Sequence, residues 1–567
     1  METKAKLRIA HLSGPNATIQ NTPPLVTSNK AREKYGLPPL RLPDGSVARF
    51  DALRTQRLAA PAKVYVEQFS AHPLERDSAE LYAAPDGYID VDGVFHTERR
   101  GPEDKPVYEI ELRPEDGLYP LPYMARQTDG CAWEEECAAP NAPDSGARQG
   151  FFPDGSRSFE EIDRLSIDPN GVVNSISALA SVDFYRLLPP SGYRKGLPAA
   201  HRTDIGEGDI PPETRGKDFF PYKPRHLASS PPRPALARVT NIAQKVMSSG
   251  KYDGAIFTQG SPAVEETAYW FNLLIDTTLP ICGNAAQRPQ GQSSNDGPQN
   301  IVDSITYIDS RIWADAEGRN RAGVIVLQEQ QAFAAREVAK ADARPGGYVA
   351  TGGHGGILGG VSHVGKPVLL YVPAYKHTYL SEVNTARLPD AARAVRLGAS
   401  GIESFELAVK NRAGEILPDA IPSVSIVKDG GYFGEDFGED PALEGDLAFL
   451  LEHKLRLGRL AGFVTEGQVP YGAMTSQARQ KIMERAVLSG LPVVRVGRGA
   501  PEGFADPTGL FLSGSNLTAT KARLLLMACL MRFGSLPAAK DPGNPTAAER
   551  KAIEEANAAY QRVFDTH

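Results

Sequence analysis

Residues 253–269, DGAIFTQGSPAVEETAY, decide the fold of this chain. The apolar run Ala-Ile-Phe predicts a buried strand, the TQGSP that follows predicts a tight polar turn, and residues 263–274 predict a helix. Ser261 therefore lies between a strand and a helix, where hydroxyls and main-chain N–H groups commonly meet a ligand. A serine in this place is a candidate catalytic or binding hydroxyl.

The length and charge of the chain exclude several classes of protein. Its 567 residues, 41% of them hydrophobic, suggest two to four domains with substantial cores. The net charge of -7 and the absence of a basic block argue against nucleic acid as a partner. No apolar run approaches the roughly 18 residues of a membrane span. The N-terminal METKAKLRIAHLSG lacks a secretory apolar region, so we expect a cytoplasmic protein without membrane contact.

Cysteine and histidine usage gives no reason to expect a metal or another cofactor. Four cysteines in so long a chain do not make a disulfide framework. Cys131 and Cys137 are six positions apart, which is not a usual zinc spacing, and the ten histidines show no paired pattern. We therefore predict neither a metal site nor a cofactor.

Strands and helices alternate along much of the chain. A first strand at 7–12 runs into a polar loop, which is how an open α/β sheet usually begins. Further strands are predicted at 255–257, 279–283 and 322–327, and helices at 237–248, 263–274 and 301–308. This alternation indicates an α/β fold with a doubly wound sheet that is mostly parallel or mixed.

A second block with the same rhythm begins near residue 420. It has predicted strands at 422–427, 460–465 and 492–496 and a helix at 518–533. Thr518 or Asn516 can cap that helix. The block predicts a smaller α/β domain, and residues 546–564 predict a final helix.

Residues 36–220 differ from both blocks. They are rich in Pro, Gly and Asp and show poor helical periodicity. Their apolar content is too high for plain disorder, and a structureless loop of that length is implausible inside a compact domain. We interpret them as a large insertion of irregular and β-rich structure, packed on the body of the protein.

Several motifs, taken in order, resemble the bacterial-type L-asparaginase/glutaminase family. The loop ending Ala-Thr-Ile at 17–19 resembles its TGGTI, and TQGSPAVEETAY at 258–269 resembles THGTDTMEETAY. Residues 283–300 resemble GAMRP…SADGPxN, and AREVAK at 335–340 resembles GRDVTK. PAYKHT at 373–378 resembles PARKHT, and 511–523 resembles VASGTLNPQKAR. The resemblance covers residues 1–35 and roughly 225–540.

This resemblance implies a two-domain asparaginase-like fold, with a larger N-terminal doubly wound domain and a smaller C-terminal α/β domain. The N-terminal catalytic domain is predicted at 1–35 and 221–400, with the 36–220 insertion packed on it. The C-terminal domain is predicted at 420–540, followed by a helical tail at 541–567.

The resemblance also implies a chemistry, hydrolysis of an amide through two hydroxyls and a lysine. Carried over to this sequence, Thr18 takes the place of the nucleophile, Ser261 that of the second hydroxyl and Lys340 that of the lysine. A hydroxyl is a poor nucleophile until a base accepts its proton. A lysine in a dry site can serve as that base, and N–H groups near Gly14 and Gly260 can stabilise an oxyanion.

Other positions are candidates for binding the substrate. Where the family has an aspartate after the second hydroxyl, this chain has Pro262, which cannot hold a substrate ammonium group. Gln259 stands where the family has a histidine, and Gly260 keeps the glycine. Tyr35 is the nearest match to the lid tyrosine, and Ser230 lies near the family's carboxylate-binding residues.

Each of these residues also has an ordinary structural interpretation. Thr18 can satisfy its own loop, Ser261 can cap the following helix, and a lone lysine such as Lys340 is usually solvated. Glu265 and Glu266 are expected to be partners of the helix dipole rather than acid–base groups.

Two further loops have simple interpretations. Asp296 is expected to bind local N–H groups. The glycine-dense residues 346–360 lack the order of a phosphate-binding loop and are expected to form a flexible loop.

We therefore expect an amidohydrolase that cleaves a small-molecule amide other than free L-Asn: a cyclic amide, an imide or a substituted amide. One alternative is a true L-asparaginase/glutaminase, in which another residue replaces the lost aspartate. The other alternative is a non-catalytic protein that binds a ligand or serves as a scaffold. The resemblance implies a homo-oligomer, a dimer or a tetramer, in which Glu502 or Asp506 reaches a neighbouring site.

Overall fold

The structure of the chain is a computed structural model. The structure describes residues 6–13, 56–57, 62–66, 85–89, 95–102, 104–112, 118–119, 179–186, 233–261, 263–288, 296–342, 346–351, 356–362, 365–429, 440–468, 472–474, 476–498 and 509–567. The chain divides into two compact units. Unit 1 comprises Met1–Pro231, Phe257–Gly260 and Ala285–Ile305, and unit 2 comprises Pro232–Ile256, Ser261–Asn284 and Thr306–His567.

Unit 1 contains the first strand and the strands of the insertion. Strand β1 (Leu7–Ser13) pairs in parallel with β8 (Ala180–Arg186), so a strand from the 36–220 segment extends along the first strand. A four-stranded sheet has the order β3-β6-β4-β5, and a two-stranded sheet joins β2 to β7. The bounds of these strands are Gln56–Arg57 (β2), Ala62–Val66 (β3), Gly87–Ile89 (β4), Phe95–His96 (β5), Lys105–Leu112 (β6) and Leu118–Tyr119 (β7). The described parts of the insertion thus contain many strands, as the sequence predicts.

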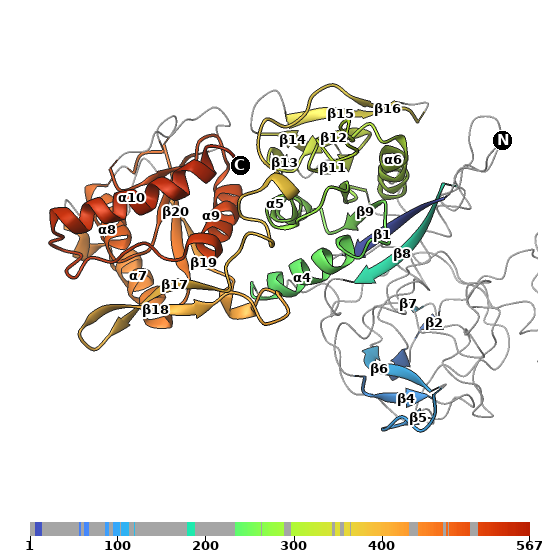
Figure 1. Ribbon diagram of the computed structural model, residues 1–567, viewed down its shortest axis with the longest axis horizontal. Helices are drawn as coiled ribbons and strands as arrows, with labels where there is room; N and C mark the ends of the chain where they lie inside the picture. The colour runs from blue at the N-terminus through green and yellow to red at the C-terminus, as the bar shows by residue number, and fades with distance from the viewer. Residues whose placement is uncertain are drawn as a thin grey trace, which may run out of the picture. The chain divides into compact units, whose positions relative to one another are not determined.

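The first half of unit 2 is a sheet with helices (Figure 1). Its strands follow the order β16-β15-β12-β11-β10-β9. Their bounds are Gly254–Thr258 (β9), Ile281–Asn284 (β10), Val324–Gln328 (β11), Gln331–Ala334 (β12), Ile357–Val361 (β15) and Pro367–Leu369 (β16). The helices are α4 (Ala235–Met247), α5 (Val264–Leu274) and α6 (Gly297–Ser310). The last two residues of β9 and the first part of α6 are counted with unit 1.

The sheet is mixed. Strands β10 and β11 are parallel, whereas β11–β12, β12–β15 and β15–β16 are antiparallel. The change of direction follows from the turn at Glu329 and Gln330, both of which have positive φ (48° and 67°). Two successive residues with positive φ form the tight hairpin turn whose twist matches that of the strands. The sequence there lacks the Asn-Gly or Asp-Gly signal, so this hairpin was not predicted.

The prediction of a flexible loop at 346–360 was wrong for the described part of that segment. It contains β14 (Tyr348–Ala350) and the start of β15. Strand β15 lies between two other strands, and a Cβ added at Gly359 would stand 1.9 Å from the Val368 carbonyl oxygen. At Gly360 it would stand 2.3 Å from the Gln330 carbonyl oxygen. These glycines serve close packing of main chains rather than flexibility.

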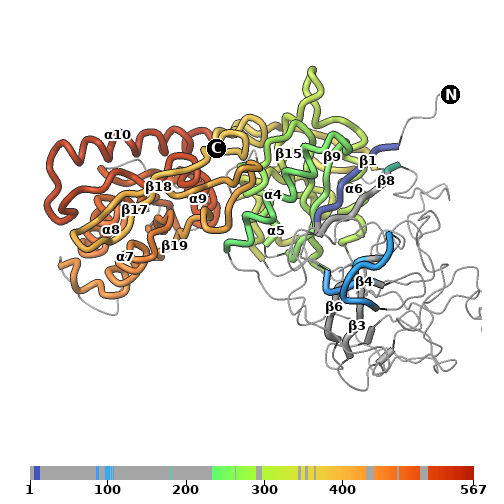
Figure 2. The backbone as a smooth tube through the Cα atoms, turned by 60° about the horizontal axis from the view of Figure 1, so that its bottom comes forward, coloured from blue at the N-terminus to red at the C-terminus, as the bar shows by residue number. Residues whose placement is uncertain are grey.

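The second half of unit 2 is a parallel sheet with the order β19-β20-β21-β22. Its strands are Ser423–Lys428 (β19), Ala461–Gly467 (β20), Val493–Gly497 (β21) and Leu512–Ser513 (β22). The helices are Gly445–Leu457 (α7), Gln477–Leu488 (α8), Ala519–Phe533 (α9) and Ala547–Phe564 (α10), with short 3-10 turns at Pro418–Ala420 (η8) and Pro441–Leu443 (η9). A third 3-10 turn, Thr378–Leu380 (η7), packs against α5 in the first half. The antiparallel hairpin of β17 (Ala391–Gly398) and β18 (Gly401–Ala408) packs against α7 through β17 (Figure 2). The predicted α/β class is confirmed.

Helices α5 and α9 join the two halves of unit 2. They pack against each other (Figure 1), and most side chains of both are buried. A helix that is apolar all round is typical of an interior position. Thr518 caps α9 by accepting a hydrogen bond from the Lys521 N–H, which confirms one of the two predicted caps. In the described part of the chain, no helix is both long and apolar enough to cross a membrane.

Candidate active site

Ser261 and Lys340 meet in unit 2, as the sequence predicts. Ser261 lies between β9 and α5, and Lys340 is the last residue of β13 (Val338–Lys340). The Nζ atom of Lys340 donates a hydrogen bond to the Ser261 Oγ atom. Helix α5 is not capped by Ser261, because its N-cap is Ala263 and no side chain caps it. The structure therefore replaces the capping interpretation of Ser261 with a hydroxyl–amine pair.

The hairpin of β13 and β14 holds Ser261 from two sides. Lys340 stands directly opposite Tyr348 in this antiparallel pair, so their side chains lie on the same face. The Tyr348 hydroxyl donates a hydrogen bond of 2.7 Å to the Ser261 main-chain oxygen. The Tyr348 ring also lies 6.5 Å from that of Phe333, in a tilted arrangement. The cross-strand pair of Lys340 and Tyr348 thus holds Ser261 by two groups, its hydroxyl and its main-chain oxygen.

Glu265 contacts the same strand. It lies in the first turn of α5, and its Oε2 atom accepts a hydrogen bond from the Lys340 main-chain N–H. Burial raises the pKa of Glu265, while the positive charge of Lys521 and the Lys340 N–H act in the opposite direction. The expectation that Glu265 is only a partner of the helix dipole is therefore incomplete. Glu266 instead pairs with Arg523 at 2.7 Å.

Lys521 is a fully buried amine beneath this arrangement. Its Nζ atom donates to the main-chain oxygens of Glu265, at 2.7 Å, and of Ala335, at 2.6 Å. It also lies 5.3 Å from the centre of the Tyr269 ring. Burial lowers the pKa of Lys521 to about 8, against the opposing effect of Glu265, Glu337 and Glu266. Sequence reasoning missed Lys521, although it lies in one of the motifs quoted above.

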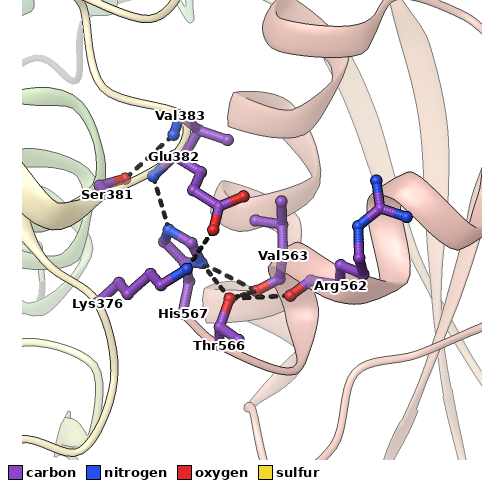
Figure 3. Close-up of polar contacts among 8 residues, drawn as sticks. All are labelled: Lys376, Ser381, Glu382, Val383, Arg562, Val563, Thr566 and His567. Carbon is purple, nitrogen blue, oxygen red and sulfur yellow. Dashed lines mark hydrogen bonds and ion pairs between the residues drawn. The ribbon is translucent and has the colours of Figure 1, made fainter.

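A second set of contacts holds the segment that leads into β13. Arg336 donates from Nε to the His567 main-chain oxygen at 2.7 Å, and pairs with Glu337 at 3.1 Å. The Tyr269 hydroxyl donates to the same His567 oxygen at 3.2 Å. His567 Nε2 accepts the Glu382 N–H at 2.8 Å, and Figure 3 shows the His567 ring between α10 and the 376–383 segment. Burial lowers the pKa of His567 to about 4.

Gln259 and Gly260 are counted with unit 1. Gln259 is 7% exposed, and its Oε1 atom has no hydrogen-bond partner among the described residues. Gly260 is half-buried. The remaining predicted site residues lie outside the described residues: Thr18, Tyr35, Ser230 and Pro262, together with Gly14, Glu502 and Asp506.

Unit 1 contains a hydroxyl contact that sequence reasoning did not predict. His11 Nε2 lies 2.8 Å from the Thr258 Oγ1 atom, and both side chains are buried. The available signal was a single histidine within the apolar strand LRIAHL. Elsewhere in unit 1, Asp296 accepts hydrogen bonds from the main-chain N–H groups of Gln287 and Arg288, as predicted.

The described residues contain no cluster of three or more His, Cys, Asp or Glu side chains suited to a metal. Unit 2 provides the Ser261 hydroxyl and the Lys340 amine, which are hydrogen-bonded to each other. It also provides the Glu265 carboxylate, which accepts a hydrogen bond from the Lys340 main-chain N–H. A hydroxyl with an adjacent base is the arrangement found in hydrolases that use a covalent nucleophile.

Comparison with known proteins finds a family match over part of the chain. Residues 227–351 match the model described as asparaginase, N-terminal. The chain is 33% identical over 155 residues to the glutaminase-asparaginase of Acinetobacter glutaminasificans, which covers 27% of this chain and 43% of that protein. It is 29% identical over 148 residues to L-asparaginase 2 of Escherichia coli K12, covering 26% and 40%. The chain thus spans less than half the length of these curated relatives.

A solved structure is also similar, the probable cytoplasmic L-asparaginase of Campylobacter jejuni. The likeness has 18% sequence identity and a TM-score of 0.44, and covers 71% of this chain and 97% of that one. On the sequence match, residues 227–351 are asparaginase-like, and this segment includes both Ser261 and Lys340. The motifs at 373–378 and 511–523 lie outside the matched segment.

Proposed function

We propose that this chain hydrolyses a carbon–nitrogen amide bond through a hydroxyl nucleophile, without a cofactor. The observation that carries the proposal is the Ser261–Lys340 hydrogen bond, within the segment that matches the asparaginase model. The names of the curated relatives, glutaminase-asparaginase and L-asparaginase 2, support the same class of reaction.

In the proposed reaction, a hydroxyl oxygen attacks the amide carbon, and its proton passes to the Lys340 side chain. Lys340 returns the proton to the nitrogen of the leaving group as the carbon–nitrogen bond breaks. Water then hydrolyses the ester, releasing the acid and restoring the hydroxyl. We retain Thr18 as the nucleophile of the first step, with Ser261 and Lys340 as the pair that moves the proton.

The identity of the substrate is a separate proposal. Position 262 is a proline, so the turn that bears Ser261 offers no side-chain carboxylate at that position to a substrate ammonium group. This favours an amide without a free α-amino group there, such as a cyclic amide, an imide or a substituted amide. We further propose that Gln259 and the Gly260 N–H contribute to substrate binding, with Tyr35, Ser230 and Pro262 as further candidates.

The second candidate function is that of a true L-asparaginase/glutaminase, which the names of the relatives favour. Ammonia release from L-Asn and L-Gln, measured beside acid release from a panel of cyclic and N-substituted amides, separates the two. Robust turnover of L-Asn or L-Gln would contradict the proposal of an altered substrate. The absence of turnover on every amide would favour the third reading, a protein that binds a ligand or serves as a scaffold.

Variants at the three site residues test the mechanism. We expect T18A, S261A and K340M each to lower kcat/KM at least ~100-fold, the usual scale for losing a nucleophile or a general base. The matched control is K376M, since Lys376 is a half-exposed lysine paired with Glu382. Its activity should stay within about twofold of the wild type, as is usual for a surface ion pair. Full activity in S261A or K340M would rule out the pair.

Assembly and location remain proposals. We propose a homo-oligomer, a dimer or a tetramer, which light scattering on purified protein can test; a monomer at working concentrations would contradict it.

We also propose a cytoplasmic location. The names of similar proteins include both a probable cytoplasmic and a probable periplasmic asparaginase, so fractionation of the source cells is the deciding measurement.

A further inference from the structure

The main-chain N–H of Lys340 points away from its own hairpin. Thr351 N–H donates to Glu337 O, and Ala341 N–H donates to Gly347 O, both at 2.8 Å. These are hydrogen-bonded pairs of the ladder, and such pairs alternate with pairs that are not hydrogen-bonded. The pair of Lys340 and Tyr348 is therefore not hydrogen-bonded, and the Lys340 N–H needs an acceptor outside the hairpin.

Glu265 supplies that acceptor from α5. Its Oε2 atom accepts the hydrogen bond from the Lys340 N–H, and Glu265 lies four positions after Ser261 in the sequence, in the first turn of α5. The residue that bears the hydroxyl and the residue that bears the amine are thus joined twice. One link is the direct Nζ–Oγ hydrogen bond, and the other runs through the first turn of α5 to the Lys340 main chain.

Lys521 connects α5 to the segment that leads into β13. It donates one hydrogen bond to the Glu265 main-chain oxygen and another to that of Ala335, which precedes β13. The charged groups that face the Glu265 carboxylate are Lys521 from α9, Lys340 from β13 and Glu266 from α5 itself. The Lys521 ammonium group on α9 therefore favours the ionised form of Glu265, whereas burial alone would favour the neutral form.

We propose that Glu265 is a positioning residue for the Ser261–Lys340 pair, and that Lys521 sets the spacing between α5 and β13 on which this depends. The inference rests on the proposed function, since it assumes that the pair activates a hydroxyl. Glu265 fixes the Lys340 main chain, so the side chain that carries the amine starts from a fixed position within reach of Ser261. Misplacement by about 1 Å can cost about 100-fold in rate.

The test measures the reactivity of Ser261 directly, so it needs no knowledge of the substrate. The probe is an alkyl fluorophosphonate: the Ser261 oxygen forms a bond to phosphorus, fluoride leaves, and the hydroxyl proton passes to Lys340. The rate of labelling at Ser261 is followed by mass spectrometry of the peptide, with the full chain throughout. Exchange of the Lys340 amide hydrogen is measured in the same samples.

The variants separate charge and geometry from general stability. E265A removes the acceptor, so we expect labelling at least tenfold slower and faster exchange of the Lys340 amide. E265Q keeps an amide oxygen that can accept the N–H, so we expect a partial rescue, about two- to fivefold slower than the wild type. The control is E266Q, whose carboxylate lies in the same turn and pairs with Arg523; it should label within about twofold of the wild type.

The outcomes are distinct. If the wild type labels at Ser261 and E265A labels equally fast, the inference is overturned while the proposed function stands. If E265A does not fold, E265Q decides, and a rate equal to that of E266Q overturns the inference. If Ser261 of the wild type does not label at all, Lys340 does not make this hydroxyl reactive and the inference is overturned, whereas attack by Thr18 is tested separately by the activity of T18A.

Discussion

Two buried lysines in unit 2 look alike and differ in their surroundings. In the α5–α9 region, Lys521 donates to two main-chain oxygens and lies near the Tyr269 ring. In the α7–β19 region, Lys454 donates to the main-chain oxygen and the hydroxyl of Ser423 and lies 5.1 Å from the Phe463 ring centre. Burial lowers the pKa of each to about 8.

The difference lies in the charges around them. Carboxylates of Glu265, Glu337 and Glu266 oppose the loss of the proton from Lys521, whereas Arg233 adds to the effect of burial on Lys454. A buried ammonium without a carboxylate serves only to satisfy its main-chain acceptors. One that faces carboxylates can also hold one of them in its ionised form. The α5–α9 region therefore combines support of the fold with support of the candidate site.

The largest expected effect is common to both lysines. Each has a pKa of about 8 in the folded protein against 10.5 in the unfolded chain, so the unfolded state binds more protons between these values. The free energy of unfolding should therefore rise by about 3 kcal/mol for each lysine as the pH rises from about 8 to 10.5. Urea unfolding followed by tryptophan fluorescence measures this. K521M and K454M should each reduce the rise by about the same amount, and a rise as large as that of the wild type in either variant would contradict the shared cause.

Two buried histidines should make the stability of the protein depend on pH on the acid side as well. His377 and His567 lie in the first half of unit 2 or contact it, and burial lowers the pKa of each to about 4 from 6.5. The unfolded state then binds more protons between pH 6.5 and 4, so stability falls as pH falls through this window, by about 1.4 kcal/mol per unit for each histidine.

His567→Gln tests this, because glutamine can accept the Glu382 N–H but does not titrate. We expect a shallower loss of stability below pH 6.5, measured by urea unfolding at several pH values. The matched control is His453→Gln, at an exposed histidine that stacks on Phe449 in α7. An unchanged acid slope in the His567 variant would show that the buried ring is not the group that titrates.

At neutral pH, replacing Lys521 and replacing Lys454 should affect the reactivity of Ser261 differently. K521M leaves the Glu265 and Ala335 oxygens without their donor and removes the cation that faces Glu265. We expect fluorophosphonate labelling of Ser261 to slow at least tenfold, which corresponds to about 1.4 kcal/mol. K454M should leave labelling within about twofold while it also lowers stability. Equal effects of both variants on labelling would mean that the two regions do not differ in function.

The smallest expected effect comes from two tyrosines. Tyr348 donates its hydroxyl hydrogen to the Ser261 oxygen, and Tyr560 donates to the Gly534 oxygen in the C-terminal half. Tyr→Phe at either position should cost about 1 kcal/mol, the scale of one hydrogen bond. Only Y348F should also slow labelling, by about threefold. Slower labelling in Y560F would point to a general effect of lost stability.

Much of the secondary structure could be predicted because its signals are local. The apolar run at 255–257 gave β9, observed as Gly254–Thr258, and the helix predicted at 263–274 is observed as Val264–Leu274. The Ala- and Leu-rich helix predicted at 518–533 is observed as Ala519–Phe533. In each case burial and chain propensity favour the same conformation. The predicted domain boundaries have no such local signal, and they stay predictions.

The tertiary contacts of the candidate site could be predicted only in part. The pairing of Ser261 with Lys340 followed from the family resemblance, but the contacts of Glu265 and Lys521 depend on residues 75 and more positions away. The strands within 346–360 were missed for a related reason. Glycines that allow two main chains to approach look, in one sequence, the same as glycines that allow a loop to move.

The two hydrogen bonds of Lys521 have a consequence for how this protein can be divided. The segment recognised by the family model ends at residue 351, and Lys521 lies 170 residues beyond that end. A fragment cut at the boundary of the recognised segment would retain Ser261, Glu265 and Lys340 and lack the amine that spans them. A fragment that keeps the hydroxyl–amine pair together with both Lys521 hydrogen bonds must therefore extend at least into α9, well past the end of the segment that matches the family model.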